Sequence, residues 1–408
     1  MSDLEVRHVP ESDLDRVMDL ADMAFHARTE DDKRERLKWM PRRADRVGVY
    51  DGDELAGFLA GLPERMSVPG GDLGCAAVTF VGVLPTHRRR GVLTMMIDRM
   101  FARAAEHGQP LAALFASEAV IYGRFGFGQA TRAVTLKIDA TRPLKLRIEP
   151  DARSPRLVPR ERAAEVLAEL YARACARRPG QLRRDPDWWA NVVVPEVHEE
   201  DDDLTTPRIV VIDGDPGGFA IYRVRGSDGS SGAPTIVEVE ELEADTPAVE
   251  ARLWQYLVSI DLVDQVKAWS VPVDGPLPLI AADTDQVKIM QDWGALWLRL
   301  VDVPAALEGR SWAAGTDLVL DVRDERIPAN HGRWRLRTRA DGGPSCARTD
   351  AEPDLSLDVR ELGAAYLGGT RVRQLARVGL VTEHTPGAAD RLDGALAVPL
   401  APFTADQF

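Results

Sequence analysis

The chain has 408 residues, an apolar fraction of 45% and a formal net charge of −14. This length predicts two or three domains, and the composition is that of ordinary globular cores. The excess of carboxylates argues against nucleic acid or anionic membranes as partners and is compatible with cationic substrates.

The first residues are too charged for a signal peptide, and no apolar run approaches the length of a membrane span. The three cysteines, Cys75, Cys175 and Cys346, are far apart and lack the spacing of metal ligands. We therefore expect a cytoplasmic protein without a disulfide framework, a metal or a membrane partner.

The N-terminal pattern predicts a strand over residues 5–10 and a helix over 11–26. A highly charged stretch, residues 27–45, follows and contains Trp39. Alternating apolar residues on both sides of an Asp-Gly-Asp-Glu turn then predict a hairpin over residues 47–68.

Residues 79–93, TFVGVLPTHRRRGVL, combine an apolar strand, a basic loop and the start of a helix. Unpaired N–H groups and the helix dipole favour an anion at such a helix start, and Gly91 permits close approach of the backbone. The pattern resembles the acetyl-CoA-binding motif of the GNAT superfamily of N-acetyltransferases. It departs from that motif at Leu93, where the family more often has a small residue.

Helical spacing over residues 92–106 and an apolar run at 111–118 predict a helix and a buried strand. The segment that follows contains Tyr122 within the pattern Y-x-x-x-G-F, which resembles the second GNAT signature. A strand over residues 132–139 is expected to close this first domain.

The middle of the chain partly repeats the first domain. It predicts helices at 158–180 and 185–193, a hairpin at 209–224, and a strand followed by a helix within 235–263. The loop ADTPAVEA (244–251) stands where the basic loop should be, and its carboxylates would repel a diphosphate. We interpret this as a degenerate second GNAT domain that does not hold coenzyme A.

The last part reads as two strands around a turn (317–337), then a strand, a helix, a Gly-Gly turn and a helix (353–381). This order resembles a sterol-carrier-protein-like domain, whose literal function would be lipid transfer.

Two GNAT-like halves followed by a sterol-carrier-like domain, with VGVLPTHRRRGVL, ASEAVIYGRFGFG and the final LAPFTADQF, resemble the Eis (enhanced intracellular survival) family. The expected fold is therefore mixed α/β, with tandem GNAT folds over 1–145 and 146–300 and a sterol-carrier-like domain over 301–408. The family implies acetyl-CoA-dependent acetylation of aminoglycosides and other polyamines by direct transfer. It also implies a homohexamer in which the chain terminus supplies the catalytic carboxylate.

The resemblance implies Tyr122 as the acid that protonates the departing thiolate and the carboxylate of Phe408 as the base that accepts the amine proton. The residues expected to bind acetyl-CoA are Val81, Gly82, Val83, Arg89, Arg90, Gly91, Val92, Leu93, Thr94, Ser117 and Glu118. Glu118 is the alternative base, and Cys75 is a less favoured alternative as an acyl-carrying nucleophile.

A polycationic acceptor calls for a wide, acidic pocket, for which Asp22, His26, Trp39 and Asp406 are the candidate wall residues. Two other functions stay open at this point. One is acetylation of protein lysines, and the other is a non-enzymatic scaffold that binds acetyl-CoA or lipid.

Overall fold

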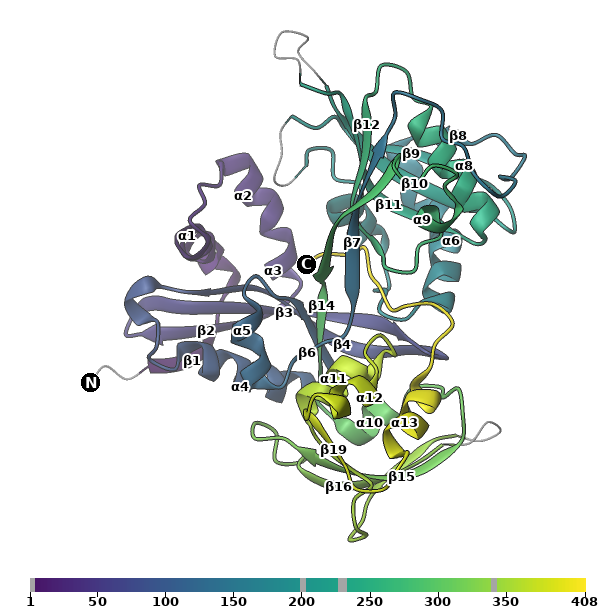
Figure 1. Ribbon diagram of the computed structural model, residues 1–408. Coiled ribbons are helices and arrows are strands. Elements are labelled where there is room, and N and C mark those ends of the chain that lie inside the picture. Colours follow the sequence, from purple (N-terminus) through teal and green to yellow (C-terminus); the bar gives the residue numbers. More distant parts are fainter. Residues whose placement is uncertain (1–3, 199–202, 227–232, 339–342) are drawn as a thin grey trace. The chain divides into compact units, whose positions relative to one another are not determined.

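The computed structural model describes residues 4–198, 203–226, 233–338 and 343–408 (Figure 1). The chain forms two compact units, and each is treated by itself. Unit 1 comprises residues 1–131, 295–398 and 408, and unit 2 comprises 132–294 and 399–407.

The first sheet of unit 1 has the strand order β1-β2-β3-β4-β5-β14-β6. Its strands are β1 (Leu4–His8), β2 (Asp45–Asp51), β3 (Glu54–Val68), β4 (Gly71–Val83), β5 (Leu111–Phe115), β14 (Leu296–Leu300) and β6 (Gly128–Gln129). Side chains alternate between the two faces of a strand. Phe58 and Ala60 therefore pack with α1 (Leu14–Phe25), whereas Leu59 packs with α4 (Val92–Glu106) on the other face.

The sequence analysis assigned no secondary structure to the charged stretch after α1. In the structure, this stretch forms the short helices α2 (Asp31–Leu37) and α3 (Trp39–Arg42). Arg34 and Lys38 on this stretch form ion pairs with carboxylates of α1, at 2.5 Å to Asp19 and 2.5 Å to Asp15 respectively. The charges thus join the stretch to α1.

The second sheet of unit 1 has the order β17-β16-β15-β18-β19. Its strands are β15 (Thr316–Arg323), β16 (Gly332–Thr338), β17 (Ser345–Arg348), β18 (Leu355–Asp358) and β19 (Val381–Glu383). Its helices are α10 (Val303–Glu308), α11 (Val359–Tyr366), α12 (Val372–Arg377) and α13 (Ala388–Leu396). The helices lie on one side of this sheet (Figure 1), which confirms the predicted sterol-carrier-like arrangement.

The sheet of unit 2 has the order β13-β7-β12-β11-β10-β9-β8. Its strands are β7 (Arg132–Asp139), β8 (Arg156–Val158), β9 (Arg208–Ile212), β10 (Gly218–Arg225), β11 (Ile236–Ala244), β12 (Gln265–Pro272) and β13 (Val287–Gly294). The helices are α6 (Ala163–Arg177), α7 (Pro186–Trp188), α8 (Pro247–Val258) and α9 (Leu277–Ile280). Phe219 packs with α6 and the adjacent Ala220 packs with α8, so these two helices cover opposite faces.

Two strands pair outside the halves in which the sequence places them. The strand over 132–139 was expected to close the first domain, but β7 lies between β13 and β12 in unit 2. In unit 1, β14 occupies the place between β5 and β6. The local spacing of apolar residues identifies a strand but not the strand it pairs with. The sequence therefore could not predict that β7 and β14 each join the other sheet. The domain boundaries at 145 and 300 stay a prediction.

Within the described residues, no helix is both long enough and apolar enough to cross a membrane.

Candidate active site

The parallel strands β4 and β5 of unit 1 pair over a short ladder and then diverge. These parallel strands pair at Cys75–Leu111, Ala76–Ala112 and Ala77–Ala113, and the ladder of the described strands ends there. The strand β4 continues to Val83 and bulges at Phe80, whose φ is +52°. A bulge bends a strand and redirects its edge. Val81 and Val83 therefore lie where the backbone of β4 has left β5.

Gly82 has a packing role. A Cβ at this position would lie 2.5 Å from Leu20 Cδ2 of α1. The glycine lets α1 pack closely on β4, and its expected cofactor contact stays a prediction.

The basic loop between β4 and α4 is fixed by one acidic residue of β2. Asp51 lies 3.1 Å from His87 Nε2 and accepts from Arg90 Nη2 at 3.1 Å. The charge of Arg90 is thus shared with Asp51, and Arg88, Arg89 and Arg90 are all exposed. Arg89 has a φ of +64° and Gly91 a φ of +85°. These turns bring the loop to the start of α4, where no side chain in the described part of the chain caps the helix.

The three residues after Gly91 are divided between core and surface. Val92 is buried, and its Cγ1 would lie 2.5 Å from a Cβ on Gly57. Leu93 and Thr94 are half-buried. The side chain of Val92 therefore packs in the core, and any contact it makes with a diphosphate comes from its backbone.

Gly91→Ala is expected to weaken acetyl-CoA binding about tenfold, because the methyl group obstructs approach of a diphosphate to the backbone. Among the described residues, a Cβ at Gly91 would meet open space, but the φ of +85° strains any residue with a side chain, so the control must carry a similar strain. Isothermal titration calorimetry with acetyl-CoA measures the effect. Gly52→Ala is the matched control, since Gly52 also has a positive φ (+63°) and open space. Equal affinities for the two variants would contradict the assignment.

The segment after β5 carries the predicted acid. Ser117 and Glu118 are exposed at the end of β5, and the short helix α5 (Ala119–Tyr122) follows. Tyr122 is 6% exposed and its ring packs edge-on against Phe127 at 6.1 Å. Burial, with a smaller contribution from Glu118, raises the pKa of Tyr122 to about 12. The phenol is therefore protonated at neutral pH and can act as a donor.

Phe408, the last residue of the sequence, lies against the same part of unit 1. It is half-buried, and its ring meets that of Phe115 edge-on at 5.4 Å between centroids. Phe115 is the final residue of β5, two residues before Ser117. The end of β5 thus links Phe408 with the segment that carries Tyr122.

The predicted acidic wall is largely neutralised by other side chains. Asp22 accepts from Thr29 Oγ1 at 2.6 Å and lies 3.6 Å from Arg34. His26 is exposed and ends α1 in a left-handed conformation, with a φ of +58°. Trp39 is half-buried under the guanidinium of Arg43, which lies 4.7 Å from the centre of the ring. A cationic acceptor at Asp22 would have to compete with Arg34.

Asp406 is a buried structural residue rather than a wall of an open pocket. Within unit 2 it accepts from Arg184 Nε at 2.9 Å, Trp188 Nε1 at 2.7 Å and the Tyr171 hydroxyl at 2.9 Å. Both members of the Arg184–Asp406 pair are 1% exposed. The sequence analysis missed Arg184, Tyr171 and Trp188, because they lie more than 200 residues from Asp406.

Cys75 is a poor nucleophile in this fold. Its side chain is fully buried in β4, and burial raises the pKa of its thiol. A nucleophilic cysteine needs an accessible thiolate. Its burial therefore argues against Cys75 as an acyl-carrying nucleophile.

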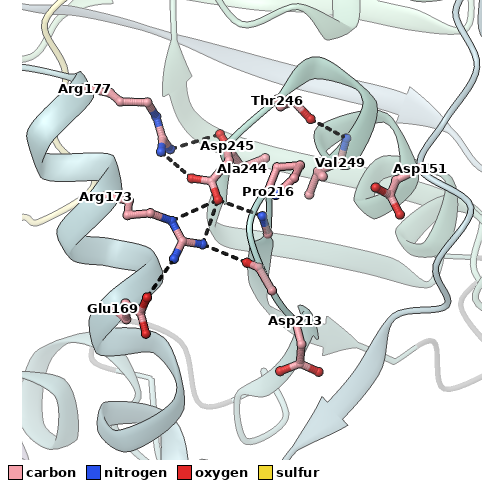
Figure 2. Close-up of polar contacts among 12 residues, drawn as sticks. Asp151, Glu169, Arg173, Arg177, Asp213, Pro216, Ala244, Asp245, Thr246 and Val249 are labelled. Atoms are coloured by element: carbon pink, nitrogen blue, oxygen red, sulfur yellow. Dashed lines mark hydrogen bonds and ion pairs between the residues drawn. The ribbon is translucent and has the colours of Figure 1, made fainter.

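In unit 2, the acidic residue of the loop that corresponds to the basic loop is paired with arginines of the same unit (Figure 2). Asp245 accepts from Arg173 at 2.7 Å, from Arg177, and from the backbone of Gly217 at 2.7 Å. Thr246 accepts from Val249 N at 3.3 Å and so caps α8. The arginine and backbone N–H donors that could otherwise bind a phosphate thus donate to the Asp245 carboxylate and the Thr246 hydroxyl of the chain itself. This supports the interpretation of a degenerate second copy.

No group of three or more His, Cys, Asp or Glu side chains within the described ranges could hold a metal ion.

Comparisons with known proteins agree with this architecture. Models described as acetyltransferase (GNAT) domain match residues 5–130 and 180–300, and a sterol carrier protein domain model matches 303–405. The fold, the diverging strands and the basic loop thus define an N-acetyltransferase with two GNAT domains and a sterol-carrier-like domain. A GNAT fold of this kind implies the use of acetyl-CoA.

The relatives identify the family. The chain is 34% identical over 375 residues to the N-acetyltransferase Eis of Mycobacterium tuberculosis, which covers 89% of this chain and 88% of that protein. It is 39% identical over 364 residues to an N-acetyltransferase of Streptomyces avermitilis, with 88% of each covered. Eis1 from Mycobacterium abscessus superposes with a TM-score of 0.84 at 31% identity over the full length of both chains. The chain belongs to the Eis family of N-acetyltransferases.

Proposed function

We propose that the chain transfers the acetyl group of acetyl-CoA to primary amines of aminoglycosides and other polyamines, in one step within a ternary complex. The observation that carries the proposal is the divergence of β4 from β5 beside the uncapped start of α4. The buried Cys75 thiol supports direct transfer. The net charge of −14 favours a polycationic acceptor.

The pantetheine arm is expected to lie along the backbone of Val81, Gly82 and Val83, whose strand has left its neighbour. The diphosphate is expected to bind at the loop and helix start from Arg89 to Thr94, with Arg89 exposed for this contact. An N–H near Val83 polarises the thioester carbonyl. Ser117 and Glu118 flank the cofactor from the end of β5.

Two proton transfers complete the reaction. An alkylamine is mostly protonated at neutral pH, so it first loses one proton to solvent and becomes a nucleophile, and its nitrogen loses a second proton as the amide forms. We assign this second proton to the carboxylate of Phe408. The new bond joins the amine nitrogen to the acyl carbon as the carbon–sulfur bond breaks, and Tyr122 donates its phenolic proton to the sulfur. The ring of Phe408 packs against Phe115, which ends β5 two residues before Ser117. This position supports the assignment of Phe408 and Tyr122 as base and acid.

The test is the release of free thiol from acetyl-CoA with a panel of aminoglycosides, spermidine and lysine peptides. Turnover is expected with the aminoglycosides and spermidine, and Tyr122→Phe should lower it about 100-fold or more if the phenol is the acid. If only lysine peptides drive turnover, the acceptors are protein lysines and the proposed acceptor class is wrong. Binding of acetyl-CoA without turnover on any amine would favour the scaffold function. The homohexamer and the cytoplasmic location stay predictions.

A further inference from the structure

The segment that carries Tyr122 is packed against the sterol-carrier-like part of unit 1. A Cβ at Gly123 would lie 2.8 Å from the guanidinium carbon of Arg360, and one at Gly128 would lie 2.0 Å from the Arg360 carbonyl oxygen. Gly126 has a φ of +82°, and a Cβ there would lie 2.8 Å from Val359. Each of these glycines thus lets the backbone after Tyr122 touch the start of α11.

A buried ion pair holds the same segment by its backbone. Arg299 of β14 is 0% exposed and donates from Nε to the Phe125 carbonyl at 3.0 Å. Its Nη2 donates to Asp324 at 2.5 Å, and its Nη1 donates to the Leu300 carbonyl at 2.7 Å. A guanidinium presents its donors in a rigid plane, so these contacts fix the Phe125 carbonyl relative to Asp324.

Asp324 is itself held at several points in the loop after β15. Its carboxylate accepts from the backbone of Arg326 and Ile327, both at 3.0 Å, and from Asn330 Nδ2 at 3.0 Å. Asn330 also donates to the carbonyls of Leu300 and Val301. The guanidinium of Arg326 lies 5.4 Å from the centre of the Phe125 ring. The sterol-carrier-like loop therefore contacts the ring of Phe125 directly and its backbone through Arg299.

Stability alone is a weak reason for this arrangement. The free energy lost when two charges leave water offsets much of their mutual attraction. Proteins in which a buried ion pair is replaced by apolar side chains are therefore often as stable as the original. A buried pair does fix geometry. Here the fixed group is the carbonyl three residues after Tyr122, in a segment whose glycines would otherwise leave it free to move.

We propose that Arg299 and Asp324 are positioning residues for Tyr122, and that the sterol-carrier-like domain serves catalysis by supporting the segment 119–128. The proposal rests on the proposed role of Tyr122 as acid. It gives this domain a task that requires no bound lipid.

The main test is a double-mutant cycle in the thiol-release assay. Asp324→Asn is expected to lower kcat roughly 10- to 100-fold, with KM for acetyl-CoA nearly unchanged, because small misplacements of a catalytic group have effects of this size. In the Tyr122→Phe background the same change should have almost no further effect. Asp317→Asn is the matched control, since it removes an exposed pair with Arg335 in the same domain. An equal loss in both backgrounds, or full activity of Asp324→Asn, overturns the proposal.

Gly126→Ala provides a second route that leaves both charges in place. Its Cβ would press on Arg299 Nε, 2.9 Å away, so the same loss of kcat is expected. Gly108→Ala is the control, because Gly108 has a φ of +63° and no described heavy atom within 4 Å of its Cβ. If Gly126→Ala behaves like this control, the positioning role is wrong.

Hydrogen exchange separates this proposal from the proposed function. Asp324→Asn is expected to speed exchange of the amides in 119–128 while acetyl-CoA binding is retained. This readout applies even if no amine drives turnover in the wild-type chain. Unchanged exchange in 119–128 would overturn the support by Arg299 and Asp324, whatever the acceptor is.

Discussion

Replacing the carboxylate of Phe408 by a carboxamide is expected to lower kcat by about 100- to 10,000-fold, because the amide cannot accept the amine proton. Expressed protein ligation supplies this change while the ring of Phe408 keeps its 5.4 Å contact with Phe115. The binding of acetyl-CoA should be unchanged. Thiol release with spermidine, measured from pH 6 to 9, gives the size of the effect.

Phe408→Leu is the matched variant for the carboxamide. It keeps the terminal carboxylate and removes the ring contact, so a smaller loss is expected than for the amide. An extension of a few residues beyond Phe408 should resemble the amide, since it moves the carboxylate away from the end of β5. If the amide retains full activity, Glu118 becomes the leading base, and Glu118→Gln is then the variant to measure.

Asp406→Ala is expected to lower the free energy of unfolding of unit 2 by about 3–5 kcal/mol, the usual cost of leaving one member of a buried ion pair without its partner. Arg184, Trp188 and Tyr171 would each lose an acceptor. Thermal unfolding should shift downward by on the order of 10 °C. Hydrogen exchange over residues 399–407 should rise, because Asp406 holds this tail within unit 2.

Two variants of unit 2 show whether this loss is specific. Asp213→Ala removes an exposed pair with Arg156, so we expect a loss of about 1 kcal/mol or less. Glu241→Gln removes the second carboxylate beside Arg184 and keeps the pair with Asp406. If Asp406→Ala were no more damaging than Asp213→Ala, the cluster would not be an anchor of the tail.

The effect of Glu241→Gln should depend on pH in a defined direction. Burial raises the pKa of Glu241 from 4.5 to about 7, against the opposing attraction of Arg184. A group with a raised pKa stabilises the fold fully below its unfolded pKa and loses that contribution as pH rises through the folded pKa. The glutamine variant should therefore gain stability relative to wild type between pH 5 and 8.

Much of the first GNAT domain could be predicted from short stretches of sequence. The helix expected over 92–106 has those bounds in the structure, and the hairpin expected over 47–68 forms β2 and β3. Apolar spacing in a window of this length depends on one buried face, which the sequence displays directly. The sequence also offered one signal that was missed. Arg299 stands inside the apolar strand LWLRL, where a buried charge requires a partner.

The candidate site was predicted in part. The basic loop lies at the uncapped start of α4 as expected, and Tyr122 is buried after β5. Arg90 is instead shared with Asp51, Asp22 is paired with Arg34, and Asp406 lies in a buried cluster. An unpaired carboxylate and a paired one look the same in a sequence. Their pairing depends on side chains that arrive from other elements.

The sequence by itself determined the family, the order of the three parts, the basic loop around Gly91 and the acidic loop that replaces it near Asp245. These are local patterns, in which residue type and spacing within one or two elements specify the chemistry. Only the tertiary structure decided that β7 and β14 exchange sheets, that Arg184 meets Asp406, and that Arg299 joins Asp324 to the Phe125 carbonyl. These are pairings between distant residues. They are selected by burial and charge across the whole fold, and no local window contains both partners.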